Sequence, residues 1–199
     1  MKRKYIKVFY RVILLVVFMG FQFYLVKRIL HLENELIFLH KTLNILLDEK
    51  LSEDIFIKEK LKIISQYIQD KVLAVRILKA IKKYSSIYEL DSDLVFSIIY
   101  KESEFNHKAV SSKGAIGLMQ VLPETADLVA RYLGRFFYDL YDIEDNIEIG
   151  CAYFHLLSRY NDLEVALRKY YAGKYFEGEE AKRYAKGILS YYDSLKMME

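Results

Sequence analysis

The chain has 199 residues, of which 53% are hydrophobic and 15% are aromatic. This apolar share is enough for the core of one domain with an accessory segment, and it excludes an intrinsically disordered protein. One proline and eight glycines leave few loop signals, and no alternating strand pattern is bounded by turn pairs. The sequence therefore predicts an all-α fold.

The formal net charge of +3 is unevenly distributed along the chain. Residues 1–31 hold seven basic residues and no acidic one. Because the whole chain carries +3 and this segment carries +7, the other 168 residues carry −4. A folded part that is acidic overall is poorly suited to binding nucleic acid, so we expect no nucleic-acid partner. The single cysteine, Cys151, excludes an internal disulfide, and its apolar helical surroundings favour a place in the core.

An uncharged run of fifteen residues, 12–26, follows five basic residues near the N-terminus. A cleaved signal peptide, an uncleaved membrane anchor and a buried core helix compete as interpretations. The residues from Tyr24 to Lys27 are all large, so no small-residue cleavage site follows the run, and a core helix would hardly follow five cations. We interpret residues 1–30 as a basic cytoplasmic tail with a single-pass anchor in the inner (cytoplasmic) membrane. The charge bias places the N-terminus inside and the rest of the chain outside, in the periplasm.

Residues 31–74 are interpreted as a helical spacer. Between positions 29 and 46, apolar residues recur at alternating spacings of three and four, which is a short heptad pattern. One interpretation is a helix lying on the domain or on the membrane surface, and the other is a homodimer through residues 29–46. A second helical segment, roughly Ser52–Gln69, could fold back on the first.

A further helix is expected to begin near Asp91 and to run through residues 94–105. At helical spacing Glu102 belongs to the apolar stripe of this helix, whereas Glu104 lies about 200° further round and points to solvent. The two carboxylates therefore cannot act as a pair across one substrate. The stripe includes Ile98, Ile99 and Phe105.

A carboxylate on a buried face is costly unless another group compensates it. Desolvation raises the pKa of such a group, which suits a general acid that works near neutral pH. The alternative is that Glu102 forms a salt bridge with a basic residue of another helix. Helix geometry leaves both interpretations open.

The segment that follows this helix has the composition of a cleft wall. Gly114 and Gly117 permit close approach of the backbone to a ligand or another segment, and Pro123 is typical of a helix start. The four histidines are scattered, and no HExxH motif or cysteine cluster occurs. We therefore expect no metal site and no cofactor.

Five segments occur in this order along the chain: ESEFN, SSKGAIGLMQVLPETA, YDIEDNIEIGCAYFHLL, ALRKYYAG and YAKGILSYYDSL. Together they resemble the soluble lytic transglycosylase (SLT) family, which is goose-lysozyme-like. The resemblance covers about residues 75–195 and implies a lysozyme-like helical catalytic domain over residues 75–199.

The resemblance also implies roles for individual residues. Glu102 matches the single catalytic acid/base of the family. Tyr171 departs from the family's usual asparagine and Lys174 from its usual proline, and both departures concern local sugar contacts rather than the chemistry. The implied substrate-binding residues are Ser103, Ser111, Met119, Gln120, Tyr170 and Tyr171.

The implied reaction cleaves the β-1,4 bond between N-acetylmuramic acid and N-acetylglucosamine in peptidoglycan glycan strands and leaves 1,6-anhydromuramoyl ends. One carboxylate suffices if the 2-acetamido group of the sugar stabilises the oxocarbenium-like centre, whereas most glycosidases need two. A hydrolytic muramidase is a close alternative. A non-catalytic peptidoglycan-binding assembly scaffold, with or without a cell-envelope machine as partner, is a more distant one.

Overall fold

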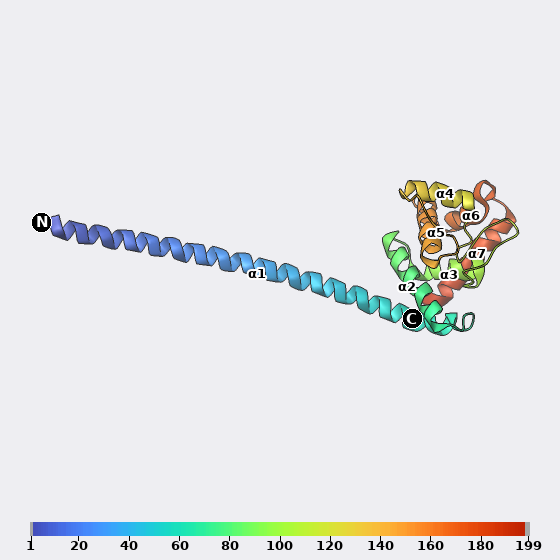
Figure 1. The fold of residues 1–199 in the computed structure, drawn as a ribbon, viewed down its shortest axis with the longest axis horizontal. Coiled ribbons are helices and arrows are strands. Elements are labelled where there is room, and N and C mark those ends of the chain that lie inside the picture. Colours follow the sequence, from blue (N-terminus) through green and yellow to red (C-terminus); the bar gives the residue numbers. More distant parts are fainter. Residues whose placement is uncertain (1, 198–199) are drawn as a thin grey trace. The chain divides into compact units, whose positions relative to one another are not determined.

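The computed structural model describes the backbone of residues 2–197 and the side chains of residues 14–197. Every named element in the described residues is a helix, which confirms the predicted all-α class (Figure 1). In chain order they are α1 (Lys2–Ile64), α2 (Lys71–Ile87), α3 (Ser92–Ser103), α4 (Pro123–Tyr132), α5 (Ile143–Ser158), α6 (Leu163–Ala172), the short 3-10 helix η1 (Gly173–Tyr175) and α7 (Glu179–Lys196).

Helix α1 runs without interruption to Ile64. The expectation of a separate helix over Ser52–Gln69 that folds back is therefore wrong, because the chain keeps its helical hydrogen bonds through residue 52. Within Leu14–Ile64 the helix is long and apolar enough to cross a membrane, and its apolar window is not buried in the protein. The side chains of the basic tail, Lys2 to Arg11, lie outside the described residues.

The chain forms two units, Met1–Ser52 and Glu53–Glu199. In the first, the apolar residues of the heptad pattern are all solvent-exposed, so association through residues 29–46 stays a prediction. The second unit contains the end of α1 and all the later helices.

The last three turns of α1 pack into the second unit. Phe56, Lys60 and Ile64, each four residues apart, are buried there. The Lys60 ammonium lies 2.6 Å from Oδ1 of Asp93 near the start of α3, and both side chains are about 5% exposed or less. The other Asp93 oxygen lies 3.2 Å from Nζ of Lys196 on α7. This buried ion pair fixes the end of α1 to the helix that carries Glu102.

Four helices of the second unit begin at an aspartate whose carboxylate accepts backbone N–H groups of the first turn. Each such cap satisfies donors that have no partner within the helix and stabilises it by about 1 kcal/mol. Helix α4 has no side-chain cap. It begins with Pro123, whose backbone nitrogen carries no hydrogen and therefore needs no acceptor. The capping residues are Asp70 for α2, Asp91 for α3, Asp142 for α5 and Asp162 for α6.

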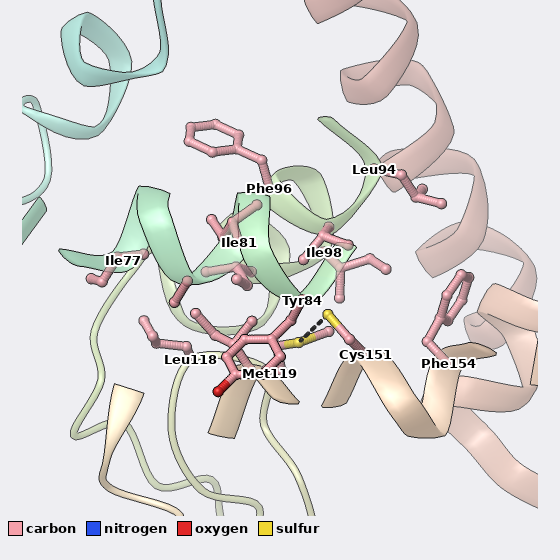
Figure 2. Close-up of a cluster of buried hydrophobic side chains, with 14 of the residues drawn as sticks. Ile77, Ile81, Tyr84, Leu94, Phe96, Ile98, Leu118, Met119, Cys151 and Phe154 are labelled. Atoms are coloured by element: carbon pink, nitrogen blue, oxygen red, sulfur yellow. Dashed lines mark hydrogen bonds between the residues drawn. The ribbon is translucent and has the colours of Figure 1, made fainter. Parts of the chain in front are cut away.

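Helix α3 packs between α2 and α7, and α5 contacts α2, α4 and α6. Apolar side chains from α2, α3 and α5 meet in a common core, which Figure 2 shows in close-up. Cys151 lies there fully buried, as expected, with its sulfur 4.0 Å from that of Met119. The core thus joins the loop before α4 to the helices around Glu102.

The segment between α3 and α4, residues 104–122, is held by one buried side chain of α5. Asn146 accepts a hydrogen bond from the Met119 N–H (2.8 Å) and donates to the carbonyls of Ile116 (2.9 Å) and Leu140 (2.8 Å). Gly117 passes so close that a Cβ there would lie 2.2 Å from Nδ2 of Asn146. Asn146 therefore fixes this loop next to the end of α3.

Candidate functional site

Helix α3 ends at Ser103, directly after Glu102. Glu104 adopts left-handed backbone angles (φ 48°, ψ 39°), and its N–H donates to the Tyr100 carbonyl (3.0 Å). Glu102 is partly buried and Glu104 is exposed. The predicted divergence of the two carboxylates is confirmed, although the end of the helix rather than its phase separates them.

The carboxyl group of Glu102 contacts helix α7 (Glu179–Lys196). The hydroxyl of Tyr184 donates a hydrogen bond to Oε1 of Glu102. Within the described side chains no basic residue forms an ion pair with Glu102, so the salt-bridge interpretation is wrong. Burial raises the pKa of Glu102 to about 7, although the Tyr184 hydrogen bond and the charge of Lys101 act in the opposite direction. At neutral pH this group can therefore hold or release a proton.

Tyr184 is a residue of the candidate site that the sequence did not indicate. It is 7% exposed, and burial together with the charge of Glu102 holds the pKa of its hydroxyl well above the usual value. The hydroxyl therefore remains a proton donor in its hydrogen bond to Glu102. The residue lies in the closing segment YAKGILSYYDSL, but neither its spacing nor its type indicated which element it would contact.

Tyr171 lies against the ring of Tyr184. Its ring stacks on that of Tyr184, with 4.6 Å between the centroids and 23° between the planes. The Lys113 ammonium, from the loop before α4, lies 5.8 Å from the centroid of the Tyr171 ring. Tyr171 is 40% exposed and Tyr184 is 7% exposed, so the Tyr171 ring lies between Tyr184 and solvent.

Tyr170, the neighbouring residue, faces the loop. Its hydroxyl donates to the carbonyl of Met119 (2.8 Å), and its ring packs against Tyr153 and Phe154. Burial, followed by the charge of Glu102, raises the pKa of the Tyr170 hydroxyl well above its usual value. Tyr170 thus lies within electrostatic reach of Glu102 while it holds the loop.

Two of the expected contact residues have structural partners within the protein. The Ser103 hydroxyl lies 2.8 Å from the Leu118 carbonyl. Ser111 accepts hydrogen bonds from the N–H groups of Ala115 (3.0 Å) and Lys113 (3.3 Å), which closes a turn. Both serines therefore shape the loop in this structure.

The two loop residues at the end of GLMQ differ in accessibility. Met119 is fully buried in the core. Gln120 adopts a left-handed backbone (φ 48°), and its side-chain amide donates to the carbonyls of Gly117 (2.9 Å) and Ala109 (3.1 Å). Gln120 is thus held in place at the surface next to Met119.

A cleft of about 650 Å³ lies between the loop before α4 and the start of α7. Three of the expected residues, Gln120, Tyr170 and Tyr171, line it, whereas Ser103, Ser111, Met119 and Glu102 do not. Glu102 lies behind the wall, linked to it through Tyr184 and the stacked Tyr171. The full lining is Lys113, Gln120, Val121, Leu122, Thr125, Tyr153, Tyr170, Tyr171, Ala172, Gly173, Tyr175, Gly178, Glu179, Glu180 and Ala181.

The site thus consists of one protonatable carboxyl, a phenol bonded to it and an aromatic cleft wall. Among the side chains of residues 14–197, no group of three or more histidine, cysteine or acidic residues is placed to hold a metal ion. Such an arrangement can supply and remove a proton at one atom, and its aromatic rings can pack on apolar sugar faces.

Comparison with known proteins gives a consistent result. The family model of the transglycosylase SLT domain matches residues 79–189. Membrane-bound lytic murein transglycosylase C of Haemophilus influenzae is 37% identical over a segment that covers 44% of this chain and 26% of that protein.

Two solved structures are similar over most of the chain. The lytic transglycosylase Slt of Pseudomonas aeruginosa, solved as an inactive mutant, has a TM-score of 0.53 and 26% identity, covering 72% of this chain and 28% of that one. The 70 kDa soluble lytic transglycosylase Slt70 of Escherichia coli has a TM-score of 0.54 and 21% identity, covering 70% and 29%. The chain therefore spans between a quarter and a third of the length of these relatives.

Proposed function

The chain belongs to the transglycosylase SLT domain family, and from this premise we propose that it is a membrane-anchored peptidoglycan lytic transglycosylase. The proposed reaction cleaves the β-1,4 bond between N-acetylmuramic acid and N-acetylglucosamine and leaves 1,6-anhydromuramoyl ends. The observation that carries the proposal is Glu102, a partly buried carboxyl with a pKa of about 7 and a phenol donor on Oε1.

Glu102 acts twice in the proposed mechanism. In its protonated form it donates its proton to the glycosidic oxygen, so that the bond from this oxygen to C1 of the muramoyl unit breaks and N-acetylglucosamine leaves as an alcohol. The carboxylate then accepts the proton of the muramoyl C6 hydroxyl, whose oxygen bonds to C1. Between the two steps, the 2-acetamido carbonyl of the sugar stabilises the positive charge, so no second carboxylate is needed.

Tyr184 stabilises the ionised form of Glu102 in this proposal. Its hydroxyl donates to the carboxylate and partly offsets the cost of burying a negative charge. Gln120, Tyr170 and Tyr171 form the substrate wall of the cleft in this proposal. Met119 contributes through its carbonyl, which fixes Tyr170, while Ser103 and Ser111 shape the loop.

The proposed location follows from α1. This helix contains one apolar stretch long enough to span a bilayer. Five basic residues before the stretch and two after it favour a single pass with the N-terminus in the cytoplasm. The second unit then faces the periplasm, on the side of the inner membrane where peptidoglycan lies.

Digestion of purified peptidoglycan tests the proposal. We expect the wild-type chain to release muropeptides that mass spectrometry identifies as anhydro products, each one water lighter than its hydrolytic counterpart. Glu102→Gln should abolish release, whereas the matched variant Glu104→Gln, two residues away and exposed, should retain it. Products without the anhydro ring would indicate a muramidase, and full activity of Glu102→Gln would refute the assignment of the acid.

Three observations favour a second candidate, a peptidoglycan-binding scaffold without activity. Tyr171 replaces the asparagine usual in the family, and its ring covers Tyr184, while Glu102 does not line the cleft. A scaffold would bind glycan strands yet release no muropeptides at any pH or salt concentration. The digestion above therefore separates the two candidates.

A further inference from the structure

Lys113 is distinctive among the described residues that line the cleft, because it is their one basic residue. The acidic residues of the lining, Glu179 and Glu180, lie at the start of α7. Glu179 already has a partner, since Nζ of Lys182 lies 2.8 Å from its carboxylate. The positive charge in the cleft is therefore located on the wall formed by the loop before α4.

The Lys113 side chain has no carboxylate partner among the residues that the structure describes. Its ammonium contacts the face of the Tyr171 ring, 5.8 Å from the centroid. The backbone around Lys113 is fixed, because the N–H groups of Lys113 and Ala115 both donate to the Ser111 hydroxyl. A flexible cationic side chain thus extends from a fixed turn into the cleft.

Contacts link Lys113 to the proposed acid by way of two rings. The ammonium lies on Tyr171, Tyr171 stacks on Tyr184, and Tyr184 donates to Glu102. Because Lys113 lines the cleft and has no carboxylate partner among the described residues, its charge is available to a ligand in the cleft.

We propose that Lys113 is a specificity-determining residue that binds a carboxylate of the glycan strand next to the scissile bond. This inference rests on the proposed function, because it takes peptidoglycan as the substrate. A strand offers carboxylates in two ways: the lactyl carboxylate of the muramoyl unit is free when the stem peptide has been removed, and the peptide carries its own carboxylates when it is present. Lys113 is exposed, and a charge-assisted hydrogen bond from its ammonium to a carboxylate adds enough affinity for about a tenfold change in binding.

Kinetics on three soluble strands test this inference and identify the source of the carboxylate. The strands carry intact stem peptides, free lactyl carboxylates, or lactyl groups converted to neutral amides. We expect Lys113→Gln to raise KM about tenfold on a carboxylate-bearing strand and to leave kcat nearly unchanged. It should leave the amidated strand unaffected, and Lys113→Arg should restore the wild-type KM. If KM rises only on the strand with free lactyl groups, Lys113 binds the lactyl carboxylate. If KM rises only on the peptide-bearing strand, Lys113 binds a carboxylate of the stem peptide.

The control is Lys108→Gln, which removes the same charge from an exposed position in the same loop outside the cleft lining. Equal KM values for wild type and Lys113→Gln on all three strands would overturn the inference, as would an equal effect of Lys108→Gln.

A binding titration without turnover separates this outcome from failure of the proposed function. If the wild type releases no product, Glu102→Gln should still bind carboxylate-bearing strands about tenfold more tightly than Glu102→Gln/Lys113→Gln, and equal affinities would refute the role of Lys113.

Discussion

The hydroxyl of Tyr184 donates a hydrogen bond to Oε1 of Glu102, although the two residues are 82 positions apart in the chain. The contact exists because α3 and α7 pack against each other. It gives the buried carboxyl a donor on one oxygen and keeps the pKa of Glu102 from rising above about 7. The protonation of Glu102 therefore depends on helix packing.

The first prediction concerns the pH dependence of the proposed cleavage. Glu102 must be protonated to act as the acid, so kcat/KM should fall as pH rises through about 7. Tyr184→Phe removes a hydrogen bond that stabilises the ionised form, and it should move this descending limb to higher pH. The measurement is the pH profile of muropeptide release.

The control for this experiment is Tyr192→Phe. Tyr192 lies on the same helix, but its hydroxyl donates to Asp91 (3.0 Å) at the start of α3. Loss of the Tyr192 hydroxyl should leave the descending limb of the pH profile at the same pH. A Tyr184→Phe profile that coincides with the wild-type profile would contradict the link between the phenol and the acid.

The second prediction concerns stability. The pKa of Glu102 is raised from 4.5 to about 7 by folding, so the folded chain binds more protons than the unfolded chain between these values. The contribution of Glu102 to the free energy of unfolding should therefore fall as pH rises through this window, by about 3 kcal/mol in total, and stay low above it. Glu102→Gln should lose this pH dependence. Chemical unfolding of wild type and variant at pH 5 and pH 8 measures the difference, and parallel changes in both would refute the prediction.

The third prediction concerns Tyr171. Tyr171→Asn removes the ring that stacks on Tyr184 and opens the wall above it. We expect the variant to alter substrate preference more than it lowers the rate, because the hydrogen bond between Tyr184 and Glu102 does not involve Tyr171. Product distributions and turnover on strands of different composition should be compared. A large fall in turnover with an unchanged product distribution would count against this role.

The fourth prediction compares two glycines of the loop. Gly114 and Gly117 have φ values of +81° and +80°, so alanine is strained at either position. A Cβ at position 114 meets open space, whereas at position 117 it would clash with Asn146 and with the Leu140 carbonyl (2.5 Å). Gly114→Ala should cost about 1 kcal/mol and Gly117→Ala several times more. Equal melting temperatures for the two variants would show that the approach to Asn146 does not constrain the loop.

The fifth prediction concerns the buried ion pair of α1. Lys60→Ala leaves Asp93 with Lys196 as its remaining cation and should lower the free energy of unfolding by about 3 kcal/mol. Lys58→Ala, on an exposed position of the same helix, should change it by less than about 0.5 kcal/mol. Denaturant unfolding in detergent micelles, followed by circular dichroism, provides both values. If Lys60→Ala lowers the free energy of unfolding no more than Lys58→Ala does, the buried ion pair of α1 does not stabilise the second unit.

Local sequence signals predicted much of the fold. The helix start near Asp91, the helix start at Pro123 and the place of Cys151 in the core depend on neighbours a few positions away, and the structure confirms all three. The expected break near Ser52 was wrong, because the residues there can equally continue a helix and no glycine or proline ends it. The apolar stretch near the N-terminus was likewise visible in the composition of the sequence.

The sequence by itself determined the all-α class, the apolar stretch near the N-terminus and the place of Glu102 on a buried helix face, because helix periodicity and composition act over short range. Tertiary structure decided which groups surround that carboxyl. The partnership with Tyr184, the cover by Tyr171 and the position of Lys113 bring together α3, α6, α7 and the loop before α4. These contacts follow from how the helices pack, and helix packing depends on the whole core rather than on any one segment.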